Sequence, residues 1–311
     1  MSNRRRRVIV NTDAKNEADD QYAIVHALLS PSLDVRGLIA AHFGTQRSAR
    51  SLLESREEID LLLELMGRAG EVPVANGAAV ALPDATTPVD SPGAQLIIEE
   101  SKKASESDPL FVAFLGPLTD MASAILLDPP IVDRPVVVVW IGGMGHGGLD
   151  PSYPGVEFNL RNDITAANVV FDSSVGLWQV PANVYSAVSV SYTELEEKIG
   201  GTSRLADYLI EQLVDWNAAW HPGPIEFRSL GDSPAVSLIL NPRGGSFRTI
   251  PAPRFNGEGG YLPGSGHPVR VCESVDVRFL LEDMFAKIRK FGREVSASAD
   301  QSRSSHDRPE H

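Results

Sequence analysis

The sequence contains a single cysteine, Cys272, among its 311 residues. One cysteine excludes an internal disulfide and any metal site built from several cysteines. Apolar runs are short, and none approaches the roughly 18 to 20 residues that a membrane-spanning helix needs. Basic residues are too few to balance the acidic ones, and the formal net charge is −13. That charge disfavours nucleic-acid binding. We therefore expect a cytoplasmic protein with neither nucleic acid nor a membrane as partner.

Strand-like and helix-like segments alternate along the chain. Short apolar runs typical of buried strands lie at 7–11, 33–44, 72–77, 110–116, 134–143 and 176–185. Segments with helical periodicity lie at 19–30, 48–67, 93–104, 117–128, 162–173, 193–219 and 275–292, and another starts near 232. This alternation predicts an α/β fold with a mostly parallel central sheet and helices on both faces.

No linker divides the chain into two domains. Residues 1–6 form a basic N-terminal stub, and residues 7–291 are predicted to form one α/β domain. Residues 292–311 are polar and poor in apolar side chains, which predicts a disordered tail. The segments 81–93 and 254–267 are rich in proline and glycine and are expected to be loops.

Four acidic residues crowd the first strand-to-helix turn, in the stretch "NTDAKNEADD". Asp13 directly follows the strand, and Glu17, Asp19 and Asp20 precede or open the helix. Like charges repel and each is costly to desolvate, so a bound cation would offset the cost. Oxygen ligands without histidine or cysteine suit Ca²⁺ or Mg²⁺ better than Zn²⁺. An aspartate at a helix start also commonly caps the helix. The group of three aspartates favours the metal.

Other polar residues follow the ends of predicted strands. In open α/β sheets, ligands bind beyond the carboxyl ends of the strands. Asp13, His42, Thr119 and the glycine pair Gly142–Gly143 would therefore converge on one edge of the sheet.

Two further candidates come later in the chain. In "YPGVEFNLRND", Glu157 and Asn159 are two residues apart, which places both side chains on one side of an extended segment. A carboxylate and an amide that face the same way could bind the hydroxyl groups of a sugar. Asp232, in "GDSPAV", precedes a helix that begins with proline, where an N-cap is the local interpretation.

Six motifs occur in a fixed order along the chain. They are the Asp13, Asp19, Asp20 group and the stretches "VPVANGAAVAL", "GPLTDMA", "VEFNLRNDITAANVVFDS", "GDSPAV" and "VDVRFLLEDMF". Together they resemble the nucleoside hydrolases, the calcium-dependent N-ribohydrolases, over about residues 7–290, in a divergent branch. The resemblance implies a glycosidase that cleaves the N-glycosidic bond of a ribonucleoside or related riboside.

The resemblance also implies a Ca²⁺ site. Asp13 would bind the ion and act as general base on a metal-bound water, and Asp20 would be the bidentate ligand. Thr119 would contribute its main-chain carbonyl. Asp232 would be the last protein ligand and would lie against the substrate.

For the sugar, the resemblance implies that Asp19 holds a ribose hydroxyl and that Glu157 and Asn159 bind the remaining hydroxyls. Thr45 stands where the family has a ribose-binding asparagine. A second family asparagine falls near Asp150 or Pro151.

Two further departures concern the ends of the site. The first turn is two residues longer than the family's, which allows Glu17 to compete for the metal. Gly231 stands where many members have a histidine that protonates the departing base. The acid would then come from His221, from Arg228 or His146, or the leaving group needs none.

Several alternatives remain open at this stage. Trp216, Trp220 and Phe227 fit a base pocket and helix packing equally well. The substrate could be another pentoside or glycoside, or the domain could bind a sugar without turnover. By resemblance we expect a homo-oligomer, a dimer or a tetramer, that acts on a small-molecule nucleoside.

Overall fold

The structure is a computed structural model that describes residues 5–146, 155–221 and 223–306. Its centre is an eight-stranded sheet in the order β3-β2-β1-β4-β5-β6-β10-β9. Neighbouring strands run parallel, apart from the antiparallel pair β9 and β10. The strands are β1 Arg6–Thr12, β2 Leu33–Ala40, β3 Val74–Asn76, β4 Leu110–Phe114, β5 Val136–Ile141, β6 Gly176–Val180, β9 Gly245–Phe255 and β10 Tyr261–Val275. This confirms the predicted α/β fold with a mostly parallel sheet.

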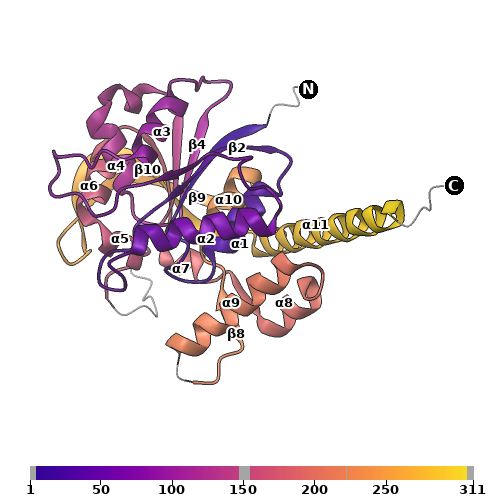
Figure 1. Cartoon of the computed structure of the whole chain (residues 1–311). Helices are drawn as coiled ribbons and strands as arrows, with labels where there is room; N and C mark the ends of the chain where they lie inside the picture. The colour runs from indigo at the N-terminus through magenta and orange to yellow at the C-terminus, as the bar shows by residue number, and fades with distance from the viewer. Residues whose placement is uncertain (1–4, 147–154, 222, 307–311) are drawn as a thin grey trace.

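Helices cover both faces of this sheet (Figure 1). One apolar cluster includes side chains of α1 Asp20–Leu28, α2 Ser51–Leu65, α8 Tyr192–Ile199, α9 Arg204–Trp220, α10 Ser233–Leu240 and α11 Val277–His306. The other includes side chains of α3 Pro92–Ser101, α4 Thr119–Leu127 and α6 Ile164–Asp172. Along β1, Val8 and Val10 belong to the first cluster and Ile9 to the second. This alternation is why the strand is apolar throughout.

Three short helices and a small second sheet complete the described chain. The helices are η1 Pro129–Asp133, α5 Phe158–Asn162 and α7 Ala182–Tyr185. The strands β7 Ser189–Ser191 and β8 Phe227–Ser229 pair in antiparallel fashion. In Figure 1, α8, α9 and β8 lie together below the main sheet. They bring the end of α9 toward the edge at which the parallel strands finish.

The expectation that residues 254–267 form a loop is wrong. Only residues 256–260 connect β9 to β10, and the rest of the segment belongs to these two strands. Proline and glycine suggested a loop, but proline is tolerated in a strand where its missing N–H needs no partner in the sheet. Pro263, the proline of this segment, lies in a part of β10 that pairs with β9 but not with β6, because the pairing with β6 is confined to Arg270 and Val271.

The polar C-terminal segment also differs from the expectation. Helix α11 continues to His306 and projects from the body of the protein, although we expected disorder from residue 292 (Figure 1). The segment continues a helix that begins at Val277, and Lys290 pairs with Glu294 one turn later. Among the described residues, no helix is both long and apolar enough to cross a membrane.

Candidate active site

The turn after β1 brings the acidic residues together beneath the first helix. Asp13 is 1% exposed, and its carbonyl oxygen accepts the Asn16 N–H at 2.8 Å. Gln21, in the first turn of α1, donates to the Ala14 carbonyl at 2.6 Å and to the carboxylate of Glu58 at 3.0 Å. The turn is therefore fixed from within and from α2.

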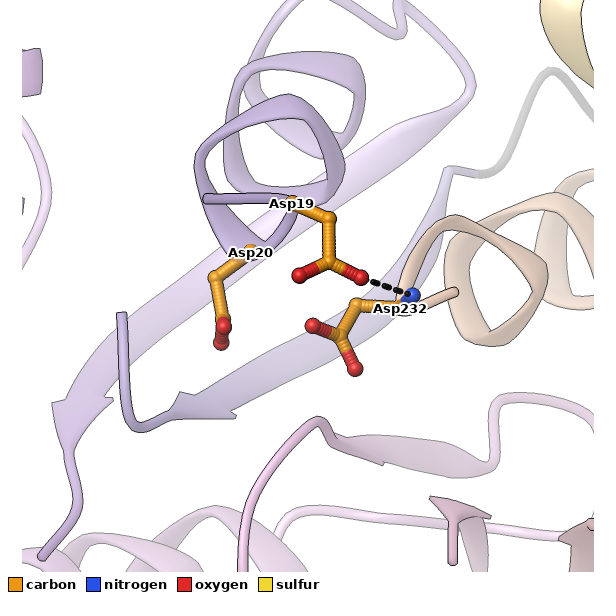
Figure 2. A group of neighbouring side chains, drawn as sticks. All are labelled: Asp19, Asp20 and Asp232. Atoms are coloured by element: carbon orange, nitrogen blue, oxygen red, sulfur yellow. Dashed lines mark hydrogen bonds between the residues drawn. The ribbon is translucent and has the colours of Figure 1, made fainter. Parts of the chain in front are cut away.

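Three buried aspartates, Asp19, Asp20 and Asp232, face one another at the starts of α1 and α10 (Figure 2). Each offers a carboxylate oxygen, and these oxygens all lie within 4.8 Å of one another. Asp19 and Asp232 occupy the N-cap positions of α1 and α10, yet neither side chain caps its own helix. Instead, Asp19 Oδ2 accepts the Asp232 N–H at 3.2 Å. Asp232 is thus the N-cap residue of α10, as its local sequence suggested, but its side chain makes no capping hydrogen bond. The three carboxylates instead form a group that could hold a metal ion.

The electrostatics of this group favour the binding of a cation. Burial, followed by repulsion from Asp19, raises the pKa of Asp20 to about 7, although the Thr12 hydroxyl donates to its carboxylate. Burial and the neighbouring aspartates raise the pKa of Asp232 well above its usual range. Without a cation, ionising these carboxylates together at neutral pH is costly.

Asp13 lies beside this group and has an unusual environment of its own. Its Oδ2 is buried without a hydrogen-bond partner. Burial and repulsion from Asp20 and Glu17 raise its pKa well above the ordinary value. The loop after β4 passes so close that a Cβ on Gly116 would lie 3.0 Å from Asp13 Cγ. A buried carboxylate oxygen without a donor is a free ligand position, and the group as a whole fits a hard cation.

These residues form the base of a cleft of about 560 Å³. We call one side of it the carboxylate half, which consists of Asp13, Asp19, Asp20, Glu157, Asn159 and Asp232. We call the other side the aromatic half, which consists of Arg47, Phe158, Trp216, Trp220, Phe227 and Arg228. A single space therefore joins acidic oxygens to aromatic rings and guanidinium groups.

Glu157 and Asn159 line the cleft, but the extended segment predicted for them is wrong. Glu157 is the N-cap of α5, and its carboxylate accepts the backbone N–H groups of Asn159, Leu160 and Gly143. The side chain of Asn159 donates to two main-chain carbonyls, Leu115 at 2.6 Å and Ile141 at 2.9 Å. Both side chains are thus held rigidly where β4 and β5 end.

Thr119 does not line the cleft. Its hydroxyl donates to Asp163 Oδ2 at 2.8 Å and accepts from His42 Nε2 at 2.9 Å, in a buried layer behind the carboxylate half. The His42 ring is oriented by the Gly44 N–H, which donates to Nδ1 at 3.2 Å. The residue of this region that lines the cleft is Leu115, just after β4. The "GPLT" stretch gave no reason to choose the residue before it.

Thr45 is exposed and also lies outside the cleft lining. Arg47, two residues later in the same loop, lines it instead. Arg47 Nη1 donates to the Asn16 carbonyl at 2.8 Å, and its Cζ lies 4.5 Å from the ring centroid of Phe158. Sequence analysis missed Arg47, because an arginine in a polar loop carries no local signal of function.

Glu17 does not belong to the group of three aspartates. Its carboxylate forms an ion pair with Arg228, in β8. His221, at the C-cap of α9, lines the cleft as expected, and Arg228 Nη1 lies 3.4 Å from its Nε2. The structure thus brings two of the three residues considered as acids, His221 and Arg228, to the aromatic half.

The third residue, His146, points elsewhere. Its Nε2 lies 2.9 Å from Gln179 Oε1, and it does not line the cleft. Asp150 and Pro151, where a family asparagine was expected, lie outside the described residues.

The three aromatic residues considered for a base pocket all line the cleft. Trp216 and Trp220 stack with ring centroids 6.0 Å apart and an interplanar angle of 27°. Trp220 and Phe227 are 56% and 53% exposed, which is more than packing between helices would leave. Large exposed aromatic side chains that gather at a cleft indicate a ligand surface.

Gly231 fits tightly against Tyr185. A Cβ at residue 231 would lie 3.0 Å from Tyr185 Cδ2 and 3.3 Å from Asp19 Oδ2. The Tyr185 hydroxyl donates to Glu157 Oε1 at 3.0 Å. Tyr185 therefore fills the space beside residue 231, and it is a further cleft residue that sequence reasoning missed.

Comparison with known proteins places this site in a family. Residues 8–282 match the family described as "Inosine-uridine preferring nucleoside hydrolase". The chain belongs to the nucleoside hydrolase family. It is therefore a glycosidase that acts on N-glycosyl compounds, with small-molecule nucleosides as the substrate class of its family.

Sequence relatives among the nucleoside hydrolases support the same assignment. The "Probable uridine nucleosidase 2" of Arabidopsis thaliana is 28% identical, over 67% of this chain and 69% of that protein. The "Pyrimidine-specific ribonucleoside hydrolase RihA" of Citrobacter koseri is 26% identical, over 65% of this chain and 69% of that protein.

Solved nucleoside hydrolases share the fold. The "Plant nucleoside hydrolase - PpNRh1 enzyme" aligns with a TM-score of 0.73 at 22% identity, and covers 91% of this chain and 99% of its own. The "Purine-Preferring Ribonucleoside Hydrolase from Gardnerella vaginalis" gives 0.74 at 20% identity, over 92% and 99%.

Proposed function

We propose that this protein is a Ca²⁺-dependent ribonucleoside hydrolase in which Asp13 takes a proton from the attacking water. The observation that carries the proposal is the group of three buried aspartates around a common point, beside the unpartnered oxygen of Asp13. A protein pays a large desolvation cost to bury such carboxylates, and a divalent cation offsets it.

The donor set favours a hard divalent cation, and the resemblance to calcium-dependent enzymes makes Ca²⁺ the proposed ion. Asp19, Asp20 and Asp232 offer only carboxylate oxygens, and no histidine or cysteine joins the group among the described residues. Oxygen donors of this kind suit Ca²⁺ rather than Zn²⁺. In the proposed site Asp20 and Asp232 are ligands together with Asp13, and Leu115 rather than Thr119 offers the main-chain carbonyl, because Leu115 lines the cleft. When bound, the cation supplies Lewis acidity that makes a neighbouring water more acidic.

The chain's own residues do the remaining work. Asp13 accepts a proton from the water through its free Oδ2 as the water attacks C1′ of the sugar. Asp19, Glu157 and Asn159 surround the sugar position and hold its hydroxyl groups, because all three line the carboxylate half. The fixed carboxylates also favour positive charge on the sugar ring in the transition state. The base lies against the rings of the aromatic half.

The experiment is a sugar-release assay with purine, pyrimidine and modified ribonucleosides, in added Ca²⁺ and in chelator. Release that needs Ca²⁺ supports the proposal and identifies the base. Release that is unaffected by chelator contradicts the metal dependence. Silence across the panel, with Ca²⁺ bound to the protein, contradicts the nucleoside substrate and favours another pentoside.

A further inference from the structure

The positive charges of the cleft are confined to its aromatic half. Arg47 and Arg228 both line this half, and they face the same carboxylate, Glu17. Arg228 Nη2 donates to Glu17 Oε2, and Arg47 Nη2 lies 4.0 Å from Glu17 Oε1. Arg228 also lies close enough to Asp19 to oppose the rise in the pKa of that carboxyl, which burial causes. Its Nε is buried without a hydrogen-bond partner, so the guanidinium keeps a free donor at the cleft.

Arg228 is held rigidly over the cleft. Its Cζ lies 4.3 Å from the ring centroid of Trp216, and its side chain is only 12% exposed. Its Nη1 also donates to Asn217 Oδ1 at 3.3 Å. A guanidinium stays charged at any physiological pH, and stacking on a ring with little water nearby strengthens its field. Arg228 is thus a fixed positive charge where the base would lie.

The neighbouring histidine is badly arranged as a proton donor. Arg228 Nη1 lies 3.4 Å from His221 Nε2. A guanidinium nitrogen can only donate, so this contact turns His221 Nε2 toward Arg228 as an acceptor and away from a departing base. Gly231, packed against Tyr185, has no side chain to offer.

We propose that Arg228 stabilises the negative charge that develops on the departing base, so that the base leaves as an anion without a proton donor. This inference rests on the proposed function. The C1′–N bond breaks and its electron pair stays on the base nitrogen, while a water oxygen forms the new bond to C1′. The proton of that water passes to Asp13, and the anionic base takes up a proton from solvent after release.

The inference names a substrate class. The enzyme selects ribosides whose aglycone forms a stabilised anion, such as a pyrimidine-2,4-dione, in which carbonyl groups spread the charge onto oxygens that a guanidinium can bind. Bases that must be protonated before they leave are poor substrates.

The test compares leaving groups in Arg228→Gln and wild-type enzyme, with Ca²⁺ present. The substrates are uridine and 5-fluorouridine, adenosine as a base that needs protonation, and p-nitrophenyl β-D-ribofuranoside, whose aglycone leaves readily as an anion. Loss of one electrostatic donor typically costs about 10²–10³ in kcat. We expect a loss of about 100-fold in kcat on uridine and of less than about fivefold on the p-nitrophenyl riboside. Arg228→Lys, which keeps the charge, should recover part of the uridine rate.

Arg270→Gln is the matched control. The Arg270 guanidinium is also stacked on two rings, at 4.5 Å from Trp178 and 4.3 Å from Phe247, but it lies outside the cleft lining. A loss in Arg228→Gln that is equal for all substrates, or confined to KM, would show a purely structural role and overturn the inference.

His221→Asn tests the competing explanation. If Arg228 carries the charge, this variant loses less than about tenfold in kcat on uridine. A loss above 100-fold on uridine with full activity on the p-nitrophenyl riboside would identify His221 as the acid, against our inference. If wild-type enzyme releases sugar from none of the substrates, the proposed function itself fails and the inference falls with it.

Discussion

The carboxylate half of the cleft comes from the turns after the parallel strands and from helix starts, whereas the aromatic half comes from α5, α9 and β8 together with the loop that carries Arg47. Asp13 follows β1, and Asp20 and Asp232 mark the starts of α1 and α10, so rigid elements fix each of them. Arg47 lies in a loop, and Trp220 is the last residue of α9. This difference separates chemistry from specificity: the strand ends and helix starts of the central sheet hold the proposed reacting groups, and α9 and β8, outside that sheet, supply most of the surface for the base.

The two halves meet at the first turn of the chain. Asp13 and Asp20 belong to the carboxylate half, while Asn16 and Glu17, between them in sequence, contact Arg47 and Arg228 of the aromatic half. The longer turn therefore serves both halves. Glu17 forms an ion pair with Arg228 and lies outside the group of three aspartates.

The largest effect is expected in the carboxylate half, for Asp13→Ala. A general base contributes about 10²–10⁴ in rate, and a change that also removes a metal ligand belongs at the upper end. We expect kcat to fall at least about 10³-fold, with the melting temperature unchanged or raised because a crowded buried charge is lost. Activity assays and thermal unfolding measure both quantities. Normal turnover in this variant would exclude Asp13 as the base.

The layer behind the carboxylate half gives a pH prediction. Burial lowers the pKa of His42 to about 4, against about 6.5 in an unfolded chain. Both states are neutral above pH 6.5, and below it the unfolded state binds a proton first. Stability should therefore fall between pH 6.5 and 4, by up to roughly 3 kcal/mol from this residue. Urea unfolding across this range should show the fall in wild type and a smaller fall in His42→Asn.

The control for this prediction is His267→Asn, because His267 is exposed. It should unfold with the wild-type pH dependence. If the stability of His42→Asn falls with pH as steeply as that of wild type, His42 is not buried in its neutral form. The buried hydrogen bond between His42 and Thr119 would then be absent in solution.

Metal binding at the carboxylate half should stabilise the folded protein. Ca²⁺ at about one hundred times its dissociation constant should stabilise the folded protein by about 2.7 kcal/mol, which thermal unfolding detects as a rise in melting temperature. Asp20→Asn should lose most of this rise, since it removes a charged ligand. Asp60→Asn, on the surface of α2, should keep it. An undiminished rise in Asp20→Asn would place the ion elsewhere.

The sequence predicted the carboxylate half better than the aromatic half for a physical reason. A strand end and the next helix start are close in sequence, so Asp13, Asp19 and Asp20 converge through local structure alone. Glu157 and Asn159 do line the cleft, but their backbone is not extended, because three N–H groups from two segments draw the Glu157 carboxylate into a helix cap.

Contacts between segments distant in sequence could not be predicted from the sequence. The Arg47 guanidinium is held at the cleft by the rings of Phe158 and Trp220, which lie more than one hundred residues away in the sequence. Tyr185 occupies the space beside Gly231, which is another contact between segments distant in sequence. Leu115 lines the cleft and Thr119 does not, and the sequence could not show this because it did not fix where β4 ends. The parallel sheet was predictable, since its alternating pattern is local, while the β9–β10 pairing was hidden by prolines.

The smallest expected effect tests whether Arg47 shapes the aromatic half. Its guanidinium lies 4.5 Å from the Phe158 ring and 5.3 Å from the Trp220 ring, and it donates to Asn16. Arg47→Gln would loosen these rings and raise KM by about tenfold, or about 1.4 kcal/mol, with a smaller change in kcat, because the reacting groups lie in the other half.

Arg161→Gln is a matched comparison for this variant. Arg161 lies 5.1 Å from the same Phe158 ring but outside the cleft lining, so we expect KM within about twofold of wild type. Steady-state kinetics on the best nucleoside of the panel measures both variants. If Arg47→Gln lowers kcat and leaves KM unchanged, the aromatic half takes part in the chemical step, and the division of labour between the halves does not hold.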